Sequence, residues 1–134
     1  MPTNANFELL IPENMPKSAG YSQLAKIHKG HTVFIAGQIA LDTSGNVVGK
    51  DDVRAQLQQI FENLKAAVEA AGGSLHDLVK LNVYFLDRAH LPVYREIRDH
   101  YINGENPPTS TAVQVAGLFR PDFLIEIEAV AVVP

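Results

Sequence analysis

Short runs of β-branched and aromatic residues, separated by glycine, proline and asparagine, dominate the hydrophobic pattern of this chain. Runs of this length with such boundaries are typical of β-strands. Lys29–His31 is predicted to be a hairpin turn between two of them, and Asp42–Asn46 has the composition of another turn. The expected strands are Phe7–Ile11 in an N-terminal arm, Leu24–His28, Thr32–Gln38, Leu78–Leu86, Thr111–Ala116 and Phe123–Val133.

One long segment has helical periodicity instead. Apolar residues from Val53 to Val68 recur at spacings of three and four, which predicts a broad apolar stripe along a helix. Asp51 is the predicted N-cap, and Gly72-Gly73 is expected to end the helix in a left-handed cap. The polar residues are mostly assigned to the opposite, solvated face: Gln56, Gln58, Gln59, Glu62, Lys65 and Glu69.

A shorter helix is predicted from Leu91 to Ile102, because Asn106-Pro107-Pro108 blocks any continuation. The order is then β-β-α-β-α-β-β, with or without a further strand at the N-terminus. No repeat or linker divides the chain, so we expect one domain over residues 1–134. The predicted fold class is α/β (α+β), with both helices packed on one face of a mixed sheet.

Strand parity separates a core face from an open face, because alternate side chains point to opposite sides of a sheet. The predicted core face is almost wholly apolar: Val79, Leu81, Val83, Phe85, Ile125, Ile127, Ala129, Ala131 and Val133. The predicted open face mixes apolar groups with amides and carboxylates: Phe34, Ala36, Gln38, Lys80, Asn82, Tyr84, Leu86, Ala112, Gln114, Ala116, Leu124, Glu126, Glu128, Val130 and Val132. Two helices cannot cover both faces. The open face is therefore interpreted as a subunit interface, with a plainly solvated face as the alternative.

Composition excludes several classes of protein. The chain of 134 residues has no cysteine, which rules out disulfides and thiolate chemistry. Lys+Arg 11 against Asp+Glu 15 gives a net charge of −4, which argues against a nucleic-acid partner. No apolar run reaches the length of a membrane span, and the N-terminus lacks a secretion pattern. A cytoplasmic protein without a membrane partner is expected.

Two glutamates are the most informative polar residues. Glu126 and Glu128 are two apart in a strand, so they point the same way among apolar neighbours. A partly buried carboxylate with a raised pKa can hold a water molecule or act as a general base, although exposed strand glutamates more commonly discourage edge pairing. His28 and His31 flank a turn without a third ligand, so no metal site is predicted.

Five segments resemble the Rid family of small deaminases in the right order along nearly the whole chain. They are Gly20–Gln23, Phe34–Ile39, Val68–Gly73, Val79–Tyr84 and Ile125–Val130. The resemblance implies a chorismate-mutase-like fold and a homotrimer with an inner β-barrel and clefts between subunits. It also implies hydrolysis of enamines or imines to carbonyl compounds and ammonia.

The same resemblance marks this chain as divergent. Family members bind the substrate carboxylate through an arginine in a Pro-Ala-Arg-Ser motif, and Ser110 occupies that position here. Arg95 replaces an asparagine of the cleft, and Gly20 replaces a proline. The retained residues are Tyr21 and Glu126. Losing a charge-assisted clamp costs roughly 1.5–3 kcal/mol of binding, which argues against efficient deamination of simple 2-imino acids.

Two compensations fit the sequence. Arg95 or Arg120 could return a guanidinium to the cleft, each having a solvated surface position as its alternative. Ser110 and Thr111 could instead offer hydroxyl groups to a ligand without a carboxylate.

The leading functional hypothesis is therefore a trimeric protein that binds a small metabolite and hydrolyses its C–N bond. Glu126 would orient or deprotonate water, and Tyr21 would hydrogen-bond to the substrate. The backbone at Gly37 and the Ser110/Thr111 pair would donate to developing oxygen charge. No cofactor is expected, because an imine carbon is already electrophilic. The alternative is a non-catalytic metabolite-binding or chaperone-like module; ribonuclease activity is opposed by the net charge.

Overall fold

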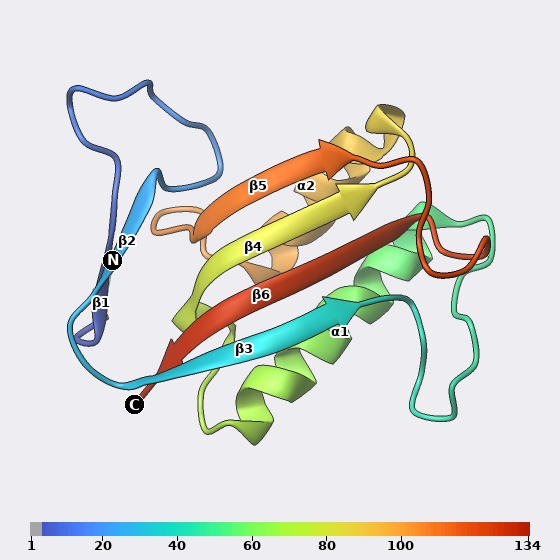
Figure 1. Ribbon diagram of the computed structural model, residues 1–134, viewed down its shortest axis with the longest axis horizontal. Helices are drawn as coiled ribbons and strands as arrows, with labels where there is room; N and C mark the ends of the chain where they lie inside the picture. The colour runs from blue at the N-terminus through green and yellow to red at the C-terminus, as the bar shows by residue number, and fades with distance from the viewer. Residues whose placement is uncertain (1–3) are drawn as a thin grey trace.

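The computed structural model describes residues 4–134, which contain two sheets and two α-helices (Figure 1). A four-stranded sheet has the order β3-β6-β4-β5, and a separate two-stranded sheet pairs β1 with β2. The elements are β1 (Phe7–Leu10), β2 (Leu24–Ile27), β3 (His31–Gln38), α1 (Val53–Ala70), η1 (Leu75–Asp77), β4 (Leu78–Phe85), η2 (Arg88–His90), α2 (Leu91–Tyr101), β5 (Thr109–Gln114) and β6 (Ile125–Val133).

Both helices cover the same face of the large sheet, as the sequence predicted (Figure 1). Strands β3 and β4 are both antiparallel to β6, and β4 is parallel to β5. The connections β3-α1-β4 and β4-α2-β5 therefore join parallel strands and advance in the same direction across the sheet. Right-handed crossovers that advance in one direction place their helices on one face. No helix of residues 4–134 lies on the other face.

The capping of α1 corrects one prediction and confirms another. The N-cap is Asp52, whose carboxylate accepts a hydrogen bond from the backbone N–H of Ala55 at 3.1 Å. Asp51 is not the cap: it precedes it in the left-handed region, with φ of 59°. The helix ends as predicted, with Gly72 at φ +90° and the N–H of Gly73 donating to the carbonyl of Val68 at 3.0 Å.

The main core lies between the helices and the sheet. All five residues assigned to the core face of β6, from Ile125 to Val133, are buried, and Phe61 of α1 stacks on Tyr94 and Tyr101 of α2. Val79 is buried elsewhere, packed with Phe7 and Val132 in a second cluster.

The placement of Val79 with the core face was therefore wrong. The register between β4 and β6 shifts between Leu78 and Lys80, and this bulge turns Val79 toward the N-terminal strands.

Two further expectations on the strands are corrected. The Lys29–His31 turn does not close a hairpin, because β2 pairs with β1 whereas β3 pairs with β6. In β5, register with β4 places Thr111 beside Asn82 on the open face. Ala112 and Gln114 therefore lie on the helix side and not on the open face as predicted; Ala116 and Leu124 lie outside the strands. The nearly uniform composition of β5 did not distinguish its two faces.

No helix within residues 4–134 is long and apolar enough to cross a membrane.

Candidate active site

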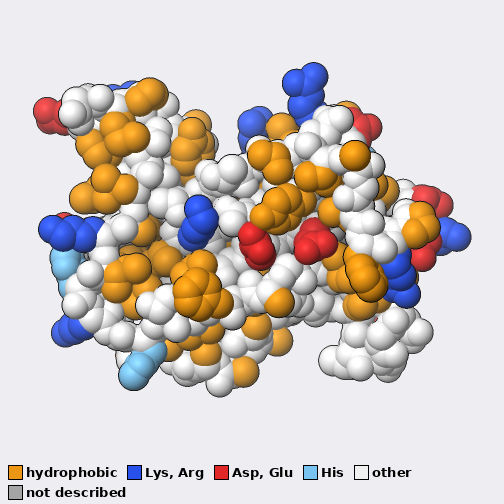
Figure 2. Space-filling view, in the orientation of Figure 1, with side chains coloured by type: hydrophobic (Ala, Val, Ile, Leu, Met, Phe, Trp, Pro, Cys, Tyr) orange, Lys and Arg blue, Asp and Glu red, His pale blue; other side chains and the backbone are white. Residues whose placement is uncertain are grey.

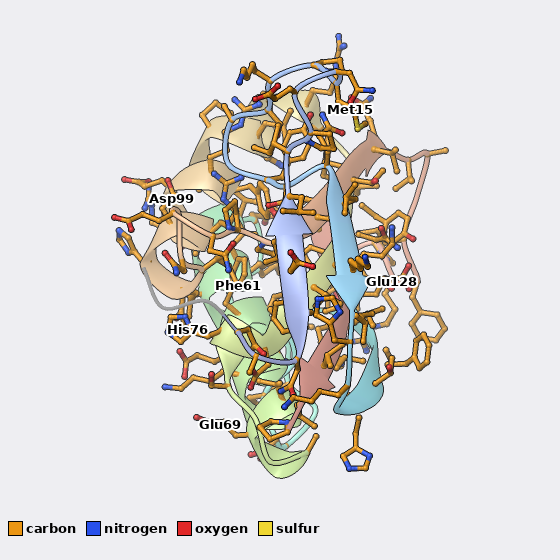
Figure 3. The ribbon with its side chains drawn as sticks, turned by 90° about the vertical axis from the view of Figure 1, so that its left-hand side faces the viewer. Met15, Phe61, Glu69, His76, Asp99 and Glu128 are labelled. Carbon is orange, nitrogen blue, oxygen red and sulfur yellow. The ribbon has the colours of Figure 1, made fainter. Side chains whose placement is uncertain are left out.

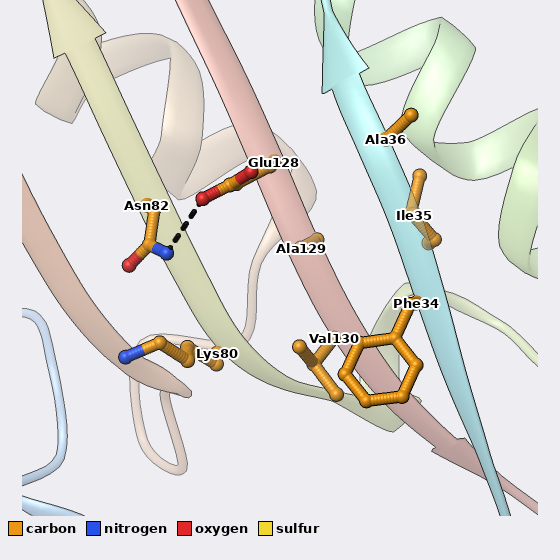
Figure 4. Close-up of a pocket in the computed structure, with 8 residues that line it drawn as sticks. All are labelled: Phe34, Ile35, Ala36, Lys80, Asn82, Glu128, Ala129 and Val130. Carbon is orange, nitrogen blue, oxygen red and sulfur yellow. Dashed lines mark hydrogen bonds between the residues drawn. The ribbon is translucent and has the colours of Figure 1, made fainter.

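The helix-free face of the large sheet has acidic side chains at its centre with hydrophobic groups around them (Figure 2). Figure 3 shows Glu128 on the opposite side of the sheet from Phe61, which lies among the helices. A hollow of about 580 Å³ opens on this face, and the side chain of Phe34 beside it is 81% exposed. The residues that line the hollow are Phe34, Ile35, Ala36, Lys80, Asn82, Glu128, Ala129 and Val130 (Figure 4).

Glu128 is held as an anion by two donors from β4. The phenol of Tyr84 donates to its Oε1 at 2.7 Å, and the amide of Asn82 donates to the same oxygen at 2.9 Å (Figure 4). These hydrogen bonds, with the charge of Lys80 nearby, lower the pKa of Glu128 below its ordinary value of 4.5. Donation to this carboxylate raises the pKa of Tyr84 in turn.

Glu126 differs from Glu128 in its hydrogen bonding and in its pKa, although it lies only two residues away on the same face. Its carboxylate accepts no hydrogen bond from any residue between 4 and 134, in contrast to that of Glu128. Burial, followed by repulsion from Glu128, raises the pKa of Glu126. It borders a second hollow of about 390 Å³ with a loop at its rim, lined by Tyr84, Val115, Gly117, Leu118, Phe119, Glu126 and Glu128.

Neighbouring carboxylates whose environments move their pKa values apart are a recurrent arrangement for acid–base chemistry. Glu128 is fixed by its donors and contributes a permanent negative charge. Glu126 has both oxygens free to hold a water molecule, and its raised pKa makes it the stronger base of the two. The pair therefore suits proton transfer to and from a small molecule in the hollow.

Gly37 of β3 keeps the space for the Glu126 carboxylate. A Cβ on Gly37 would lie 2.0 Å from Oε2 of Glu126, far inside van der Waals contact. The β3–β6 register is irregular between Ile35 and Gln38, and this irregularity places Gly37 against that carboxylate.

We expect Gly37→Ala to displace the Glu126 carboxylate and to lower kcat for any reaction that depends on it by at least about tenfold, as misplacement of catalytic groups does. The matched control is Gly104→Ala, because a Cβ there meets nothing within 4 Å. Steady-state kinetics of the two variants check this. Equal activity in both would show that the position of the carboxylate does not matter.

Tyr21 lies at the opposite end of the sheet. Ser22 bridges to Thr109 at the start of β5, and its Oγ donates to the carbonyl of Pro107 at 2.6 Å. The backbone carbonyl of Tyr21 accepts a hydrogen bond from the Ser18 hydroxyl at 2.6 Å. These contacts fix the segment that carries Tyr21 against the first residues of β5.

Tyr21 and Glu126 therefore do not meet within one chain. Tyr21 lies near the end of β4 marked by Lys80, whereas Glu126 pairs with Tyr84. Lys80 and Tyr84 are separated by about 13 Å at roughly 3.3 Å per strand residue. A site that uses both Tyr21 and Glu126 requires a second copy of the chain.

The remaining predicted site residues do not share one surface. Ser110 is directed to the helix side, next to Tyr94, while Thr111 is exposed on the open face. Arg95 is exposed on α2. The guanidinium of Arg120 stacks on Phe123 at 4.9 Å.

Within residues 4–134, no group of three or more histidine, aspartate or glutamate side chains is arranged to hold a metal ion.

Sequence reasoning placed Asn82 and Tyr84 on the open face but did not identify them as the donors to Glu128. Strand alternation predicts which face of the sheet a side chain occupies. Which residue it contacts on the adjacent strand depends on the register between β4 and β6. The low exposure of the Arg98 side chain on α2, 11%, was also not predicted from the sequence.

A family described as Endoribonuclease L-PSP matches residues 12–133 of the chain. The chain belongs to this family, the Rid family. The resemblance seen in the sequence and the predicted mixed fold are thereby confirmed. A solved Rid-family structure from Yersinia pestis has a TM-score of 0.87 and 35% sequence identity, covering 96% of this chain and 99% of that one.

Curated relatives of this Rid-family chain include proteins named as deaminases. A RutC family protein from Pyrococcus horikoshii is 43% identical over 92% of this chain and 96% of its own. A 3-aminoacrylate deaminase from Acinetobacter baylyi is 35% identical over the same shares. A 2-iminobutanoate/2-iminopropanoate deaminase from Dermatophagoides farinae is 33% identical over 84% and 85%. Deamination of enamines and imines therefore occurs among its relatives.

Proposed function

We propose that this Rid-family protein is a deaminase that hydrolyses the C–N bond of a small enamine or imine, releasing ammonia and a carbonyl compound. The observation that carries the proposal is the Glu126 carboxylate, which has no hydrogen-bond partner in residues 4–134 and borders a hollow beside the fixed anion Glu128. Relatives named as deaminases of 3-aminoacrylate and of 2-iminobutanoate support it.

The reaction assigns one task to each group. An enamine first takes a proton on carbon to become an imine. Water then adds to the imine carbon while Glu126 accepts a proton from that water and the nitrogen gains one. The resulting carbinolamine collapses with loss of ammonia, leaving a C=O bond. The balance is addition of water and release of ammonia, without oxidation or reduction.

Further donors, one of them from the opposite end of the sheet, complete this scheme. The hydroxyl of Tyr21 would hydrogen-bond to the substrate or the carbinolamine. The backbone at Gly37, beside Glu126, and the hydroxyl of Thr111 on the open face would donate to the developing oxygen charge, whereas Ser110 points to the helix side and does not share this role.

We further propose a homotrimer that assembles this site from two copies. Glu126 of one copy would face Tyr21 of the adjacent one, because the two residues lie at opposite ends of a single sheet. The helix-free face supports this assembly: Phe34 is 81% and Val113 is 42% exposed, an arrangement that a cyclic assembly of identical chains would bury. Sedimentation equilibrium at micromolar concentration tests it, and a monomer would contradict both the assembly and the shared site.

The alternative function is a non-catalytic metabolite-binding module with the same cleft. Ser110 favours it, because the arginine expected at that position of the strand is absent. Release of ammonia and of the carbonyl product from a panel of imines and enamines tests the choice. Turnover above the uncatalysed rate supports the deaminase, whereas an intact compound bound without turnover supports the binding module.

A further inference from the structure

The loop that joins β5 to β6 forms one rim of the hollow that Glu126 borders (Figure 1). Its first residue is tied to β4, because the N–H of Val115 donates to the carbonyl of Phe85 at 2.9 Å. Its far end is tied to α1, because the side-chain amide of Gln56 donates to the carbonyl of Asp122 at 2.9 Å. Both ends of the loop are therefore fixed, and the residues between them are positioned at the edge of the hollow.

This loop presents the ring of Phe119 to solvent. The side chain of Phe119 is 84% exposed, although it lines the same hollow as the two carboxylates. The next side chain is directed elsewhere, because the guanidinium of Arg120 lies over the buried ring of Phe123, 4.9 Å from its centre. Removing an aromatic ring from water is favourable, so the Phe119 ring gains from any apolar group that enters the hollow beside it.

The charged groups of this hollow are both acidic. Within residues 4–134, the side chains that line it include Glu126 and Glu128 and no lysine, arginine or histidine. Glu128 is ionised at neutral pH, because its hydrogen-bond donors lower its pKa. A substituent with a carboxylate of its own would therefore be repelled from the hollow. The rest of the lining is uncharged: Tyr84, Val115, Gly117, Leu118 and Phe119.

We propose that Phe119 recognises an uncharged, apolar substituent of the substrate, of aromatic or branched aliphatic size, in this hollow. The inference rests on the proposed function and narrows its substrate to imines and enamines whose carbon chain carries such a group. The volume of about 390 Å³ leaves room for a substituent much larger than a methyl group. Water adds to the imine carbon beside Glu126, while the substituent lies against the Phe119 ring.

The test compares imines that share one head group and differ in their substituent: those of phenylpyruvate, pyruvate and oxaloacetate. We expect Phe119→Ala to lower kcat/KM for the phenylpyruvate imine roughly 10- to 100-fold, as loss of an apolar contact of side-chain size does. Its kcat/KM for the pyruvate imine, whose substituent is a methyl group, should stay within about twofold of the wild type. Phe119→Leu should recover part of the loss. Ile27→Ala, which removes an exposed apolar side chain from β2, is the control and should change neither value.

The wild type should also favour the phenylpyruvate imine over the oxaloacetate imine by at least about tenfold, because the latter brings a second carboxylate to the acidic hollow. Comparable kcat/KM values for these two imines would overturn the inference. Equal losses of Phe119→Ala on the phenylpyruvate and pyruvate imines would overturn it as well.

Sedimentation equilibrium of Phe119→Ala separates substrate recognition from a contact between copies of the chain. An unchanged assembly supports the inference, whereas loss of the wild-type assembly would make Phe119 an interface residue and overturn it.

Further outcomes separate this inference from the proposed function. Turnover of the pyruvate imine without turnover of the phenylpyruvate imine would overturn the role of Phe119 and leave the deaminase in place. If the wild type turns over none of the three imines, the proposed deaminase fails, and calorimetric titration with phenylpyruvate then judges Phe119 by itself. Binding that is at least about tenfold weaker in Phe119→Ala supports the inference; equal affinity in both proteins, or no binding by the wild type, overturns it.

Discussion

Replacing Glu126 with glutamine is expected to lower kcat for ammonia release by roughly 100- to 10,000-fold, the usual contribution of a general base. Glutamine keeps the size of the side chain but cannot accept a proton from water. The fold should survive. Because the pKa of Glu126 is raised in the folded protein, its contribution to stability is lost as the carboxylate ionises with rising pH. Glutamine removes that penalty, so Tm at neutral pH should be unchanged or higher.

The pH dependence of kcat/KM provides a second test of Glu126 as the general base. A general base works only when deprotonated, so kcat/KM should fall on the acidic side through a pKa above the ordinary 4.5 of a glutamate. Glu128→Gln removes the neighbouring charge that contributes to the raised pKa, and should move this acidic limb to lower pH.

Glu69→Gln is the control for both variants, because Glu69 is exposed on α1, away from the site (Figure 3). Full activity of Glu126→Gln would remove the proposed mechanism. An acidic limb that stays in place in Glu128→Gln would show that the two carboxylates do not interact.

The second large effect is expected on stability, from Gln56→Leu. Gln56 is fully buried, and its amide donates to the carbonyls of Gly49 and Asp122 at 3.0 and 2.9 Å, while its carbonyl accepts from the N–H of Leu124 at 2.9 Å. Leucine fills the space but leaves all three backbone groups without this partner. At about 1 kcal/mol for each hydrogen bond, unfolding should become easier by roughly 2–4 kcal/mol.

Thermal unfolding followed by circular dichroism measures this effect as a Tm lowered by about 8–15 °C. Gln58→Leu, at an exposed position of the same helix, is the matched control and should change stability by less than about 0.5 kcal/mol. Because Leu124 directly precedes the strand that carries Glu126, Gln56→Leu should also lower activity below its unfolding temperature. A Tm equal to that of Gln58→Leu would show that the three hydrogen bonds contribute nothing net.

Gln56 illustrates where a pattern in the sequence stops being informative. Helical periodicity assigned it with the other glutamines to the polar face of α1. The structure buries it because backbone groups from two loops, at Gly49 and Asp122, need a partner there. Those loops are distant in sequence, and no local spacing shows that they converge on one side chain.

In the candidate site, too, some features were predictable from the sequence and others were not. Alternation along β6 was enough to put Glu126 and Glu128 on one face, with the helices on the other. Their different protonation behaviour was not predictable, since it depends on which strand pairs with β6 and in which register. The low exposure of Arg98 likewise arises only because α2 packs beside Gly20.

By itself the sequence determined the helix periods, the glycine stop after α1, the order of elements and the existence of a helix-free face. These features depend on residues within a few positions of one another, so local sterics and side-chain periodicity encode them. Only the tertiary structure decided the bulge at Val79, the face of β5, the burial of Gln56 and the partners of Glu128. Each of these depends on pairing between segments far apart in the chain, where strand register and packing replace local pattern as the controlling interaction.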